Sequence, residues 1–320
     1  CYRLWSQGAQ GSLLPFTPPE IRNADLAPLV LEMANWGVND PQKLTWLDPP
    51  PEGGISAARQ LLQLLGALDE SHQLTPVGKR LALLPIHPRL GRLLIMAEKI
   101  ECLPLACDMV ALLSEPAIKH FRREANQRSE SDILDRLEQL WRYRLQGDFS
   151  EFQIIEKTAT YWKQHYNIQP RKAQADYSPS LISKLLACAF PDRIGRQRED
   201  GSRRYLLASG QGAHLSERSA LRNETFLVAT ELAGKRSEEG QIIEANRLTL
   251  EDILSLYPDC SWQTQVFWDN NAGRICGRKA LMLGRLPLAE KNCAVSTDET
   301  TNIILDVIRD EGLGILNWSS

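Results

Sequence analysis

Basic residues gather in one short segment near residue 200, where their type and spacing suit the binding of a polyanion. The segment 184–204 carries six lysines and arginines against three acidic residues. Arginines neutralise phosphates, and a neighbouring ring can stack on a base, so this combination is typical of proteins that hold single-stranded nucleic acid. Tyr205 directly follows the segment. The side chains that we single out for such binding are Arg193, Arg196, Arg198, Arg203 and Arg204.

A solvated loop without a partner fits the same residues equally well. We expect residues 193–204 to form a glycine-containing loop that runs into a strand. On the rim of a β-barrel, such a loop would present its arginines beside Tyr205 to a nucleic-acid strand. The choice between the two interpretations depends on the fold that carries the segment.

Three other segments are weaker candidates for the same chemistry. Residues 274–291 carry five basic residues against Glu290, and a purely structural role fits them slightly better. The glycines of SGQGAHL, at 209–215, would let a ligand approach the backbone closely. Arg89 and Arg92 lie in LPIHPRLGRLL, where surface salt bridges at a boundary between modules are the plainer interpretation.

The residues that nucleotide hydrolysis requires are missing from the sequence. A P-loop reads GxxxxGK[ST], because its backbone cradles phosphates while the lysine and the hydroxyl hold the γ-phosphate and magnesium. The nearest approach, Gly78-Lys79-Arg80, has Gln73 in place of the first glycine, and we expect it on a structural helix. No acidic box or arginine-rich nucleotide motif occurs, and the five histidines form no HExxH. We therefore predict no catalytic residue, no metal site and no ATP hydrolysis by this chain itself.

Helix signals dominate the first 190 residues. A capping box at 17–20 predicts a helix that stops at Gly37, and further helices are predicted to begin at Ser56 and at Thr75. From Pro85 to Phe190 the apolar residues keep helical spacing, which predicts a bundle of four to six helices there. The stretch 119–148 mixes both charges and is interpreted as a solvated helix face.

After Pro191 the sequence becomes β-prone. Strand-like runs alternate with Gly-rich or Asn-rich turns, and DNNAG at 269–273 predicts a hairpin. A late helix is predicted to begin at Thr297. Four tryptophans fall on apolar positions of their elements and are expected in the core: Trp141, Trp162, Trp262 and Trp268.

Composition bounds the class of protein. The chain has 320 residues, of which 43% are hydrophobic and 24% charged, as in ordinary globular proteins of two or three domains. The net charge of -3 provides no global attraction for a polyanion, so binding must depend on a local basic surface. Seven cysteines without CxxC pairs predict reduced thiols and a cytoplasmic protein, and the lack of a long apolar run predicts no membrane partner. The opening CYRLW, which begins without methionine, is expected to be an internal strand of a longer protein.

Several stretches of the chain together resemble the region that follows the motor core in bacterial DEAH-box RNA helicases of the HrpB type. The resemblance is strongest in CYRLWS, in PPEIRNADLAPLVLEMANWGV with DPQKLTWLDPPP, and in LLGALD followed by LTPVGKRLALLPIHPRLGRLL. It continues more loosely through LLSEP, AFPDRIGRQ and RRYLLASGQGAHL. Gln211 stands where the turn of this family often holds an arginine, which weakens that turn as an RNA contact.

The resemblance implies an α+β multidomain fold, with a winged helix followed by a helical ratchet-like bundle and a β-rich OB-like domain. The implied boundaries are a remnant strand of the second RecA-like motor domain at 1–16, the winged helix at 17–86, the bundle at 87–190 and the OB-like domain at 191–320.

The resemblance also implies a function. The chain would be the accessory, RNA-guiding region of an ATP-dependent RNA helicase, binding single-stranded RNA or DNA mainly through phosphates. It would hold no cofactor itself, since ATP and Mg would bind the missing RecA-like motor domains, which would be its partners. Arg89 and Arg92 would then face the motor or the RNA strand. The alternative is a non-enzymatic winged-helix regulator or protein-interaction module, which the single basic residue of the helix 56–68, Arg59, disfavours.

Overall fold

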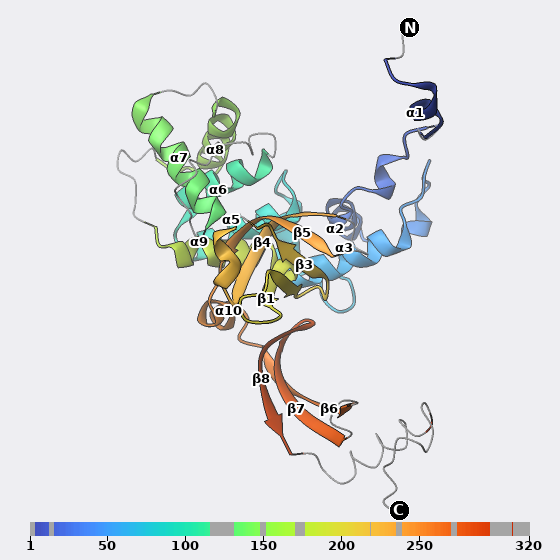
Figure 1. Cartoon of the computed structure of the whole chain (residues 1–320). Helices are drawn as coiled ribbons and strands as arrows, with labels where there is room; N and C mark the ends of the chain where they lie inside the picture. The colour runs from blue at the N-terminus through green and yellow to red at the C-terminus, as the bar shows by residue number, and fades with distance from the viewer. Residues whose placement is uncertain are drawn as a thin grey trace, which may run out of the picture. The chain divides into compact units, whose positions relative to one another are not determined.

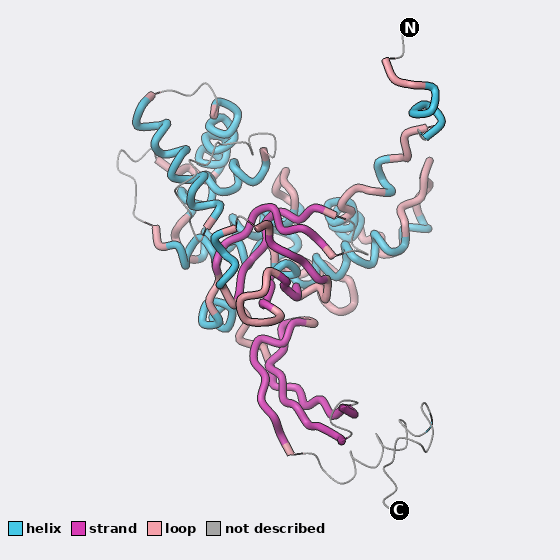
Figure 2. The backbone as a smooth tube through the Cα atoms, in the orientation of Figure 1, coloured by secondary structure: helices cyan, strands magenta, loops and turns pink. Residues whose placement is uncertain are grey.

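The computed structural model describes residues 4–12, 16–115, 131–147, 152–169, 177–217, 219–234, 239–269, 274–294 and 309. The chain divides into two compact units, Cys1–Arg92 and Leu93–Ser320. Figure 1 labels the elements, and Figure 2 colours helices and strands. No helix in the described part of the chain has both the length and the apolar character that crossing a membrane requires.

The first unit is helical. Its elements are α1 (Gln7–Ser12), η1 (Glu20–Arg22), α2 (Ala27–Asn35), η2 (Pro41–Lys43), α3 (Glu52–Leu64), α4 (Pro76–Ala82) and the first residues of α5 (Pro88–Lys99). Leu68 and Leu74, in the segment between α3 and α4, form an isolated β-bridge. In the predicted opening strand, Leu4 and Trp5 are exposed and belong to no strand, and residues 1–3 lie outside the described residues.

Two predicted helix starts in this unit are wrong. The capping box at 17–20 does not begin a long helix, because Pro19 is extended and only the single turn η1 follows it. The helix α2 begins at Ala27, whose amide donates to the Asp25 carboxylate at 2.9 Å. The next helix, α3, begins at Glu52, before the predicted Ser56. The start at Thr75 is confirmed, since its hydroxyl accepts from the Gly78 amide at 2.9 Å.

The second unit begins with the helices that the apolar spacing predicts. After α5 come α6 (Leu103–Ser114), α7 (Asp132–Gln146), α8 (Gln153–His165) and α9 (Pro179–Ala189). Their facing sides bury large apolar residues, among them Leu105, Met109, Leu137 and Ile155. Trp141 and Trp162 are buried as expected. The predicted helical bundle is therefore formed.

The charged stretch 119–148 is only partly a solvated face where the structure describes it, since Glu138 and Arg142 are exposed but other charged residues are not. Residues 116–130 and 148 lie outside the described residues. On α7, the side chain of Arg136 is only 8% exposed, because its guanidinium lies between Glu244 and the carbonyl oxygen of Leu112. Arg136 is therefore a charged residue of α7 that packs inside the molecule.

A closed barrel of five short strands follows the bundle. The strands are β1 (Ile194–Gln197), β2 (Arg204–Leu207), β3 (Gly212–Leu215), β4 (Phe226–Ala233) and β5 (Gly240–Arg247). They close in the order β1-β2-β3-β5-β4, with β3 and β5 parallel and the other pairs antiparallel. Tyr205, Leu207, Leu227 and Ile242 fill the interior. This is an OB-like barrel.

The barrel corrects the prediction of a loop at 193–204. Residues 194–197 form β1, and only the residues between it and Arg204 form a turn. A strand of four residues that includes Gly195 and Arg196 has little local signal, because its stability comes from pairing with β2 and β4.

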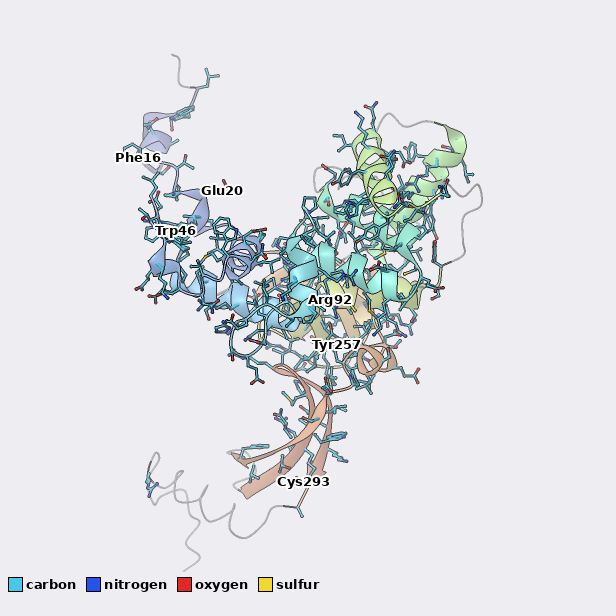
Figure 3. All side chains as sticks on the ribbon, turned by 180° about the vertical axis from the view of Figure 1, so that it is seen from behind. Phe16, Glu20, Trp46, Arg92, Tyr257 and Cys293 are labelled. Atoms are coloured by element: carbon cyan, nitrogen blue, oxygen red, sulfur yellow. The ribbon has the colours of Figure 1, made fainter. Side chains whose placement is uncertain are left out.

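The helix α10 (Leu250–Leu256) and a three-stranded antiparallel sheet complete the described chain. The helix was not predicted, although Thr249 and Asp252 form a capping box at its start. Tyr257, labelled in Figure 3, donates from its hydroxyl to the carbonyl oxygen of Ala187 on α9 at 2.9 Å.

The sheet consists of β6 (Ser261–Asp269), β7 (Arg274–Leu283) and β8 (Leu286–Cys293). The predicted hairpin is confirmed by the pairing of Asp269 with Arg274, while its turn, 270–273, lies outside the described residues. The predicted helix at Thr297 also lies outside them. Trp262 corrects an expectation, since it is exposed on the sheet rather than buried in a core.

Candidate nucleic-acid interface

The end of the β1–β2 hairpin gathers three of the predicted arginines. The two strands pair with Gln197 opposite Tyr205, and the amide of Arg198 donates to the carbonyl oxygen of Arg204 at 3.0 Å. The side chain of Gln197 holds the turn from inside, with hydrogen bonds to the carbonyl oxygens of Ser202 at 2.6 Å and Arg222 at 2.7 Å. Arg198 and Arg204 thus meet across the strand ends, with Arg203 beside them.

Strand alternation explains why Arg204 is exposed. Tyr205 and Leu207 are fully buried in the barrel, so Arg204 and Leu206 point outward. The buried Tyr205 hydroxyl donates to the carbonyl oxygens of Leu221 and Glu224, and burial raises the pKa of its phenol above the ordinary value. Tyr205 is therefore a core residue and no stacking partner for a base, contrary to the expectation of a ring beside the arginines.

The arginines lie over the neighbouring strand β3. Arg204 pairs in register with His214. A side chain at Gly212 would come within 2.8 Å of an Arg198 Nη2 atom, so the guanidinium lies directly over this glycine. The outer face of β2 and β3 thus carries Arg198, Arg204 and His214, and Arg203 lies next to them at the strand end. We call these four residues the barrel patch.

The ion pairs of the barrel patch are loose. Arg203 lies 3.0 Å from Glu217, but these side chains are 46% and 85% exposed. Arg204 lies 3.6 Å from Glu239 and is 66% exposed. Exposed pairs of this kind contribute about 0–1 kcal/mol, so a phosphate can replace the carboxylate at little cost.

The other predicted arginines have different surroundings. Arg193 donates to the carbonyl oxygen of Thr230 at 2.7 Å, and Arg196 donates to that of Pro287 at 2.8 Å. Arg89 is buried and Arg92 half-buried in the first unit. The hydrogen bonds of Arg193 and Arg196 tie the barrel to its surroundings, and nucleic-acid binding by these four residues stays a prediction.

The glycine-containing turn at 209–215 has a packing explanation. Its last residues form β3. At Gly210, where φ is +86°, an added side chain would meet the Cδ atom of Arg285 at 2.8 Å. The close approach that this glycine allows is thus made by Arg285, which also donates its amide to the carbonyl oxygen of Ala208.

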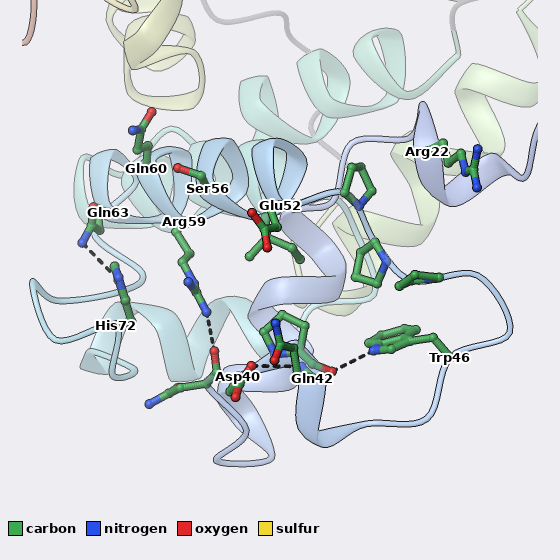
Figure 4. Close-up of a pocket in the computed structure, with 16 residues that line it drawn as sticks. Arg22, Asp40, Gln42, Trp46, Glu52, Ser56, Arg59, Gln60, Gln63 and His72 are labelled. Atoms are coloured by element: carbon green, nitrogen blue, oxygen red, sulfur yellow. Dashed lines mark hydrogen bonds between the residues drawn. The ribbon is translucent and has the colours of Figure 1, made fainter.

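A cavity of about 1150 Å³ opens in the first unit (Figure 4). Trp46 donates to the carbonyl oxygen of Pro41 in its wall, and Arg59 donates to that of Asn39. The charged residues of its lining balance, with two arginines and two carboxylates. This cavity has no net charge that would select a polyanion. Among the described residues, cavity included, no group of His, Cys, Asp and Glu side chains could hold a metal ion.

Two family models match adjacent parts of the chain. The helicase associated domain (HA2), winged-helix, matches residues 58–86, and the helicase associated domain (HA2), ratchet-like, matches residues 87–152. The chain is 34% identical over 309 residues to the ATP-dependent RNA helicase HrpB of Escherichia coli strain K12. The chain carries the helicase-associated region of the DEAH-box helicases. The resemblance to HrpB-type helicases is therefore confirmed, as is the predicted order of winged helix, ratchet-like bundle and OB-like domain.

The extent of these similarities is uneven. The HrpB match covers 94% of this chain and 34% of that relative. Prp22 of Schizosaccharomyces pombe, a pre-mRNA-splicing factor ATP-dependent RNA helicase, is 35% identical over 41% of this chain and 11% of its own length. A crystal structure of the E. coli DExH-box NTPase HrpB matches with a TM-score of 0.69 at 29% identity, over 98% of this chain and 36% of that one. The helicase-associated chain thus spans about a third of the length of HrpB.

Proposed function

We propose that this helicase-associated region guides single-stranded RNA for an ATP-dependent RNA helicase. The observation that carries the proposal is the barrel patch on the outer face of β2 and β3. In OB-folds, oligonucleotides bind to this face and to the turn between the first two strands. The patch offers guanidinium groups in loose ion pairs, which suits contacts to phosphate that do not depend on sequence.

The motor belongs to other parts of the same protein in this proposal. Two RecA-like domains would bind ATP and Mg and would be the partners of this chain in the cytoplasm. The region described here would keep the strand engaged while the motor moves it. DNA strands would bind the patch in the same way, since phosphates are common to both.

A winged-helix regulator gains no support from the first unit. A helix that reads DNA bases presents basic or polar side chains to the groove. The only basic residue of α3 is Arg59, and its guanidinium donates to the carbonyl oxygen of Asn39. The regulator remains the alternative to be tested rather than a second proposal.

The test is the affinity of the purified chain for a labelled single-stranded oligouridine at constant salt. Replacing Arg198, Arg203 and Arg204 together by glutamine should weaken binding about 10- to 100-fold, because three phosphate contacts are lost. The matched control replaces three exposed basic residues of the helical bundle by glutamine: Lys99, Arg142 and Lys157. It removes the same charge and should change the affinity much less. Equal losses in the two triple variants would contradict a specific role for the barrel patch.

A further inference from the structure

The two faces of the sheet β6-β7-β8 differ in charge. Side chains alternate between the faces, and the register places Trp262, Lys279 and Lys291 on one face and Phe267 and Arg278 on the other. Two contacts agree with this assignment. The Lys291 ammonium lies 4.3 Å from the centre of the Trp262 ring, and the Arg278 guanidinium lies 5.4 Å from that of Phe267.

On the Phe267 face, Arg278 and the neighbouring Arg196 have acidic or backbone partners. Arg278 lies 3.3 Å from Glu290, and Arg196 of the barrel lies 3.9 Å from the same carboxylate. Arg196 also donates to the carbonyl oxygen of Pro287. This face is therefore close to neutral and partly occupied by the barrel.

The opposite face, which we call the tryptophan face, is defined by Trp262, Thr264, Lys279 and Lys291. Trp262 is 45% exposed, and the other three residues are exposed as well. Within the described residues, neither Lys279 nor Lys291 forms an ion pair with a carboxylate, and the register places no acidic side chain on this face. This face therefore combines an exposed ring with two nearby lysines that have no acidic neighbour on the same face, which is the combination that binds single-stranded nucleic acid.

We propose that the tryptophan face is a second contact for single-stranded nucleic acid, with one base stacked on Trp262 and phosphates on Lys279 and Lys291. Stacking on an aromatic ring is tolerant of sequence, because every base has a flat face. The inference deepens the proposed function and rests on it, since it adds a base contact to the phosphate contacts of the barrel patch.

The contact between Lys291 and Trp262 suits this role. A cation over an exposed ring is held more weakly than a base stacked on that ring. An incoming base therefore takes the place of the ammonium, which then pairs with a phosphate beside the base. In the free chain, Lys291 covers only part of the ring, since Trp262 is 45% exposed.

The experiment compares two strands of equal length, an oligouridine and a strand of abasic sugars, in binding to the full chain. Trp262→Ala should weaken binding of the oligouridine about 5- to 10-fold and leave the abasic strand unaffected, because only bases stack. Trp262→Phe keeps a ring and should retain most of the affinity. The matched control is Phe267→Ala, which removes an exposed ring from the opposite face of the same sheet and should leave both strands bound as before.

Each outcome decides between the proposals. Unchanged oligouridine binding by Trp262→Ala would overturn the stacking contact, and so would an equal loss on both strands, which would mark the tryptophan as structural. If the barrel-patch variant loses affinity while Trp262→Ala does not, the tryptophan face fails and the proposed function stands. If the unaltered chain binds neither strand, both fail.

Discussion

Helix α7 and the end of the β1–β2 hairpin are both rich in arginine, yet they use it differently. The side chains of Arg136 and Arg144 on α7 are 8% and 22% exposed and reach acidic partners on other elements. Those of Arg203 and Arg204 at the hairpin are far more exposed, and their acidic partners are exposed too. A basic segment therefore becomes a candidate for binding only where the fold leaves its charges loosely paired.

Arg144 of α7 belongs to a network that joins the bundle helices. Asp108 on α6 accepts from Arg144 at 2.6 Å and from Trp141 at 3.2 Å, and it pairs with Lys163 of α8 at 2.7 Å. Burial alone would raise the pKa of Asp108, but the hydrogen bonds and charges of Arg144 and Lys163 outweigh it and hold that pKa below the ordinary value. The carboxylate therefore stays ionised in the core of the bundle.

The largest expected effect comes from breaking this network. Replacing Asp108 by alanine leaves Arg144 and Lys163 without their shared partner and should lower the free energy of unfolding by about 3–5 kcal/mol. Urea denaturation measures the change. The control is Glu217→Ala at the barrel patch, where the carboxylate is exposed and a change within about 0.5 kcal/mol is expected. Similar losses in the two variants would remove the contrast between the regions.

A smaller loss is expected where α7 meets the barrel. The N-cap residue of α7, Ser131, donates to the buried Asn246 of β5, and Arg136 pairs with Glu244. Arg136→Ala should lower the free energy of unfolding by about 2–3 kcal/mol, because it removes hydrogen bonds to a charged group. The control is Arg247→Ala, whose pair with Glu224 is more exposed and should contribute about 0–1 kcal/mol. A larger loss at Arg247 would contradict the burial argument.

Acid should weaken the bundle in a way that depends on Asp108. Since its folded-state pKa lies below the ordinary value of 3.8, its contribution is complete above that pH and is lost as the pH falls through the folded-state pKa. The free energy of unfolding should therefore fall as the pH drops below about 4. Asp108→Asn should be less stable at neutral pH and show a shallower acid dependence than the unaltered chain. Parallel curves for the two proteins would contradict this assignment.

The smallest expected effect is on RNA binding by the arginines at the end of the β1–β2 hairpin. Glu217→Gln releases Arg203 from its exposed pair and should strengthen binding to single-stranded RNA about 2-fold at low salt. Fluorescence anisotropy can resolve this change. Weaker binding would mean that Glu217 orients Arg203 instead of competing with the phosphate.

The sequence could predict an element of the fold only where the signal for that element was local. The cap at Thr75 was predictable, because its hydroxyl binds an amide three residues later on the same helix. The strand β1 was not, because it is short and one of its two partner strands, β4, pairs through the distant Phe226. The start of α2 was misplaced because Thr17 and Glu20 have the spacing of a capping box, whereas the Asp25 carboxylate accepts from the first amide of the helix.

The candidate site was predictable only in part. The basic residues between 193 and 204 stand out by composition, but their division into packing and exposed arginines depends on which face of β1 and β2 each one occupies. Trp262 was expected in a core, since an aromatic residue in a strand is usually buried, and its exposure follows from the sheet's unpartnered face. Such facts of tertiary structure are invisible to local patterns.

The most direct test of the account is the salt dependence of RNA binding. The logarithm of the affinity for oligouridine should fall linearly with the logarithm of the salt concentration, at roughly 0.7 per phosphate contact on a single strand. The variant that replaces Arg198, Arg203 and Arg204 should show a slope smaller by about 2, whereas the bundle control should keep the slope of the unaltered chain. An unchanged slope in the barrel-patch variant would contradict the claim that these arginines hold the phosphates.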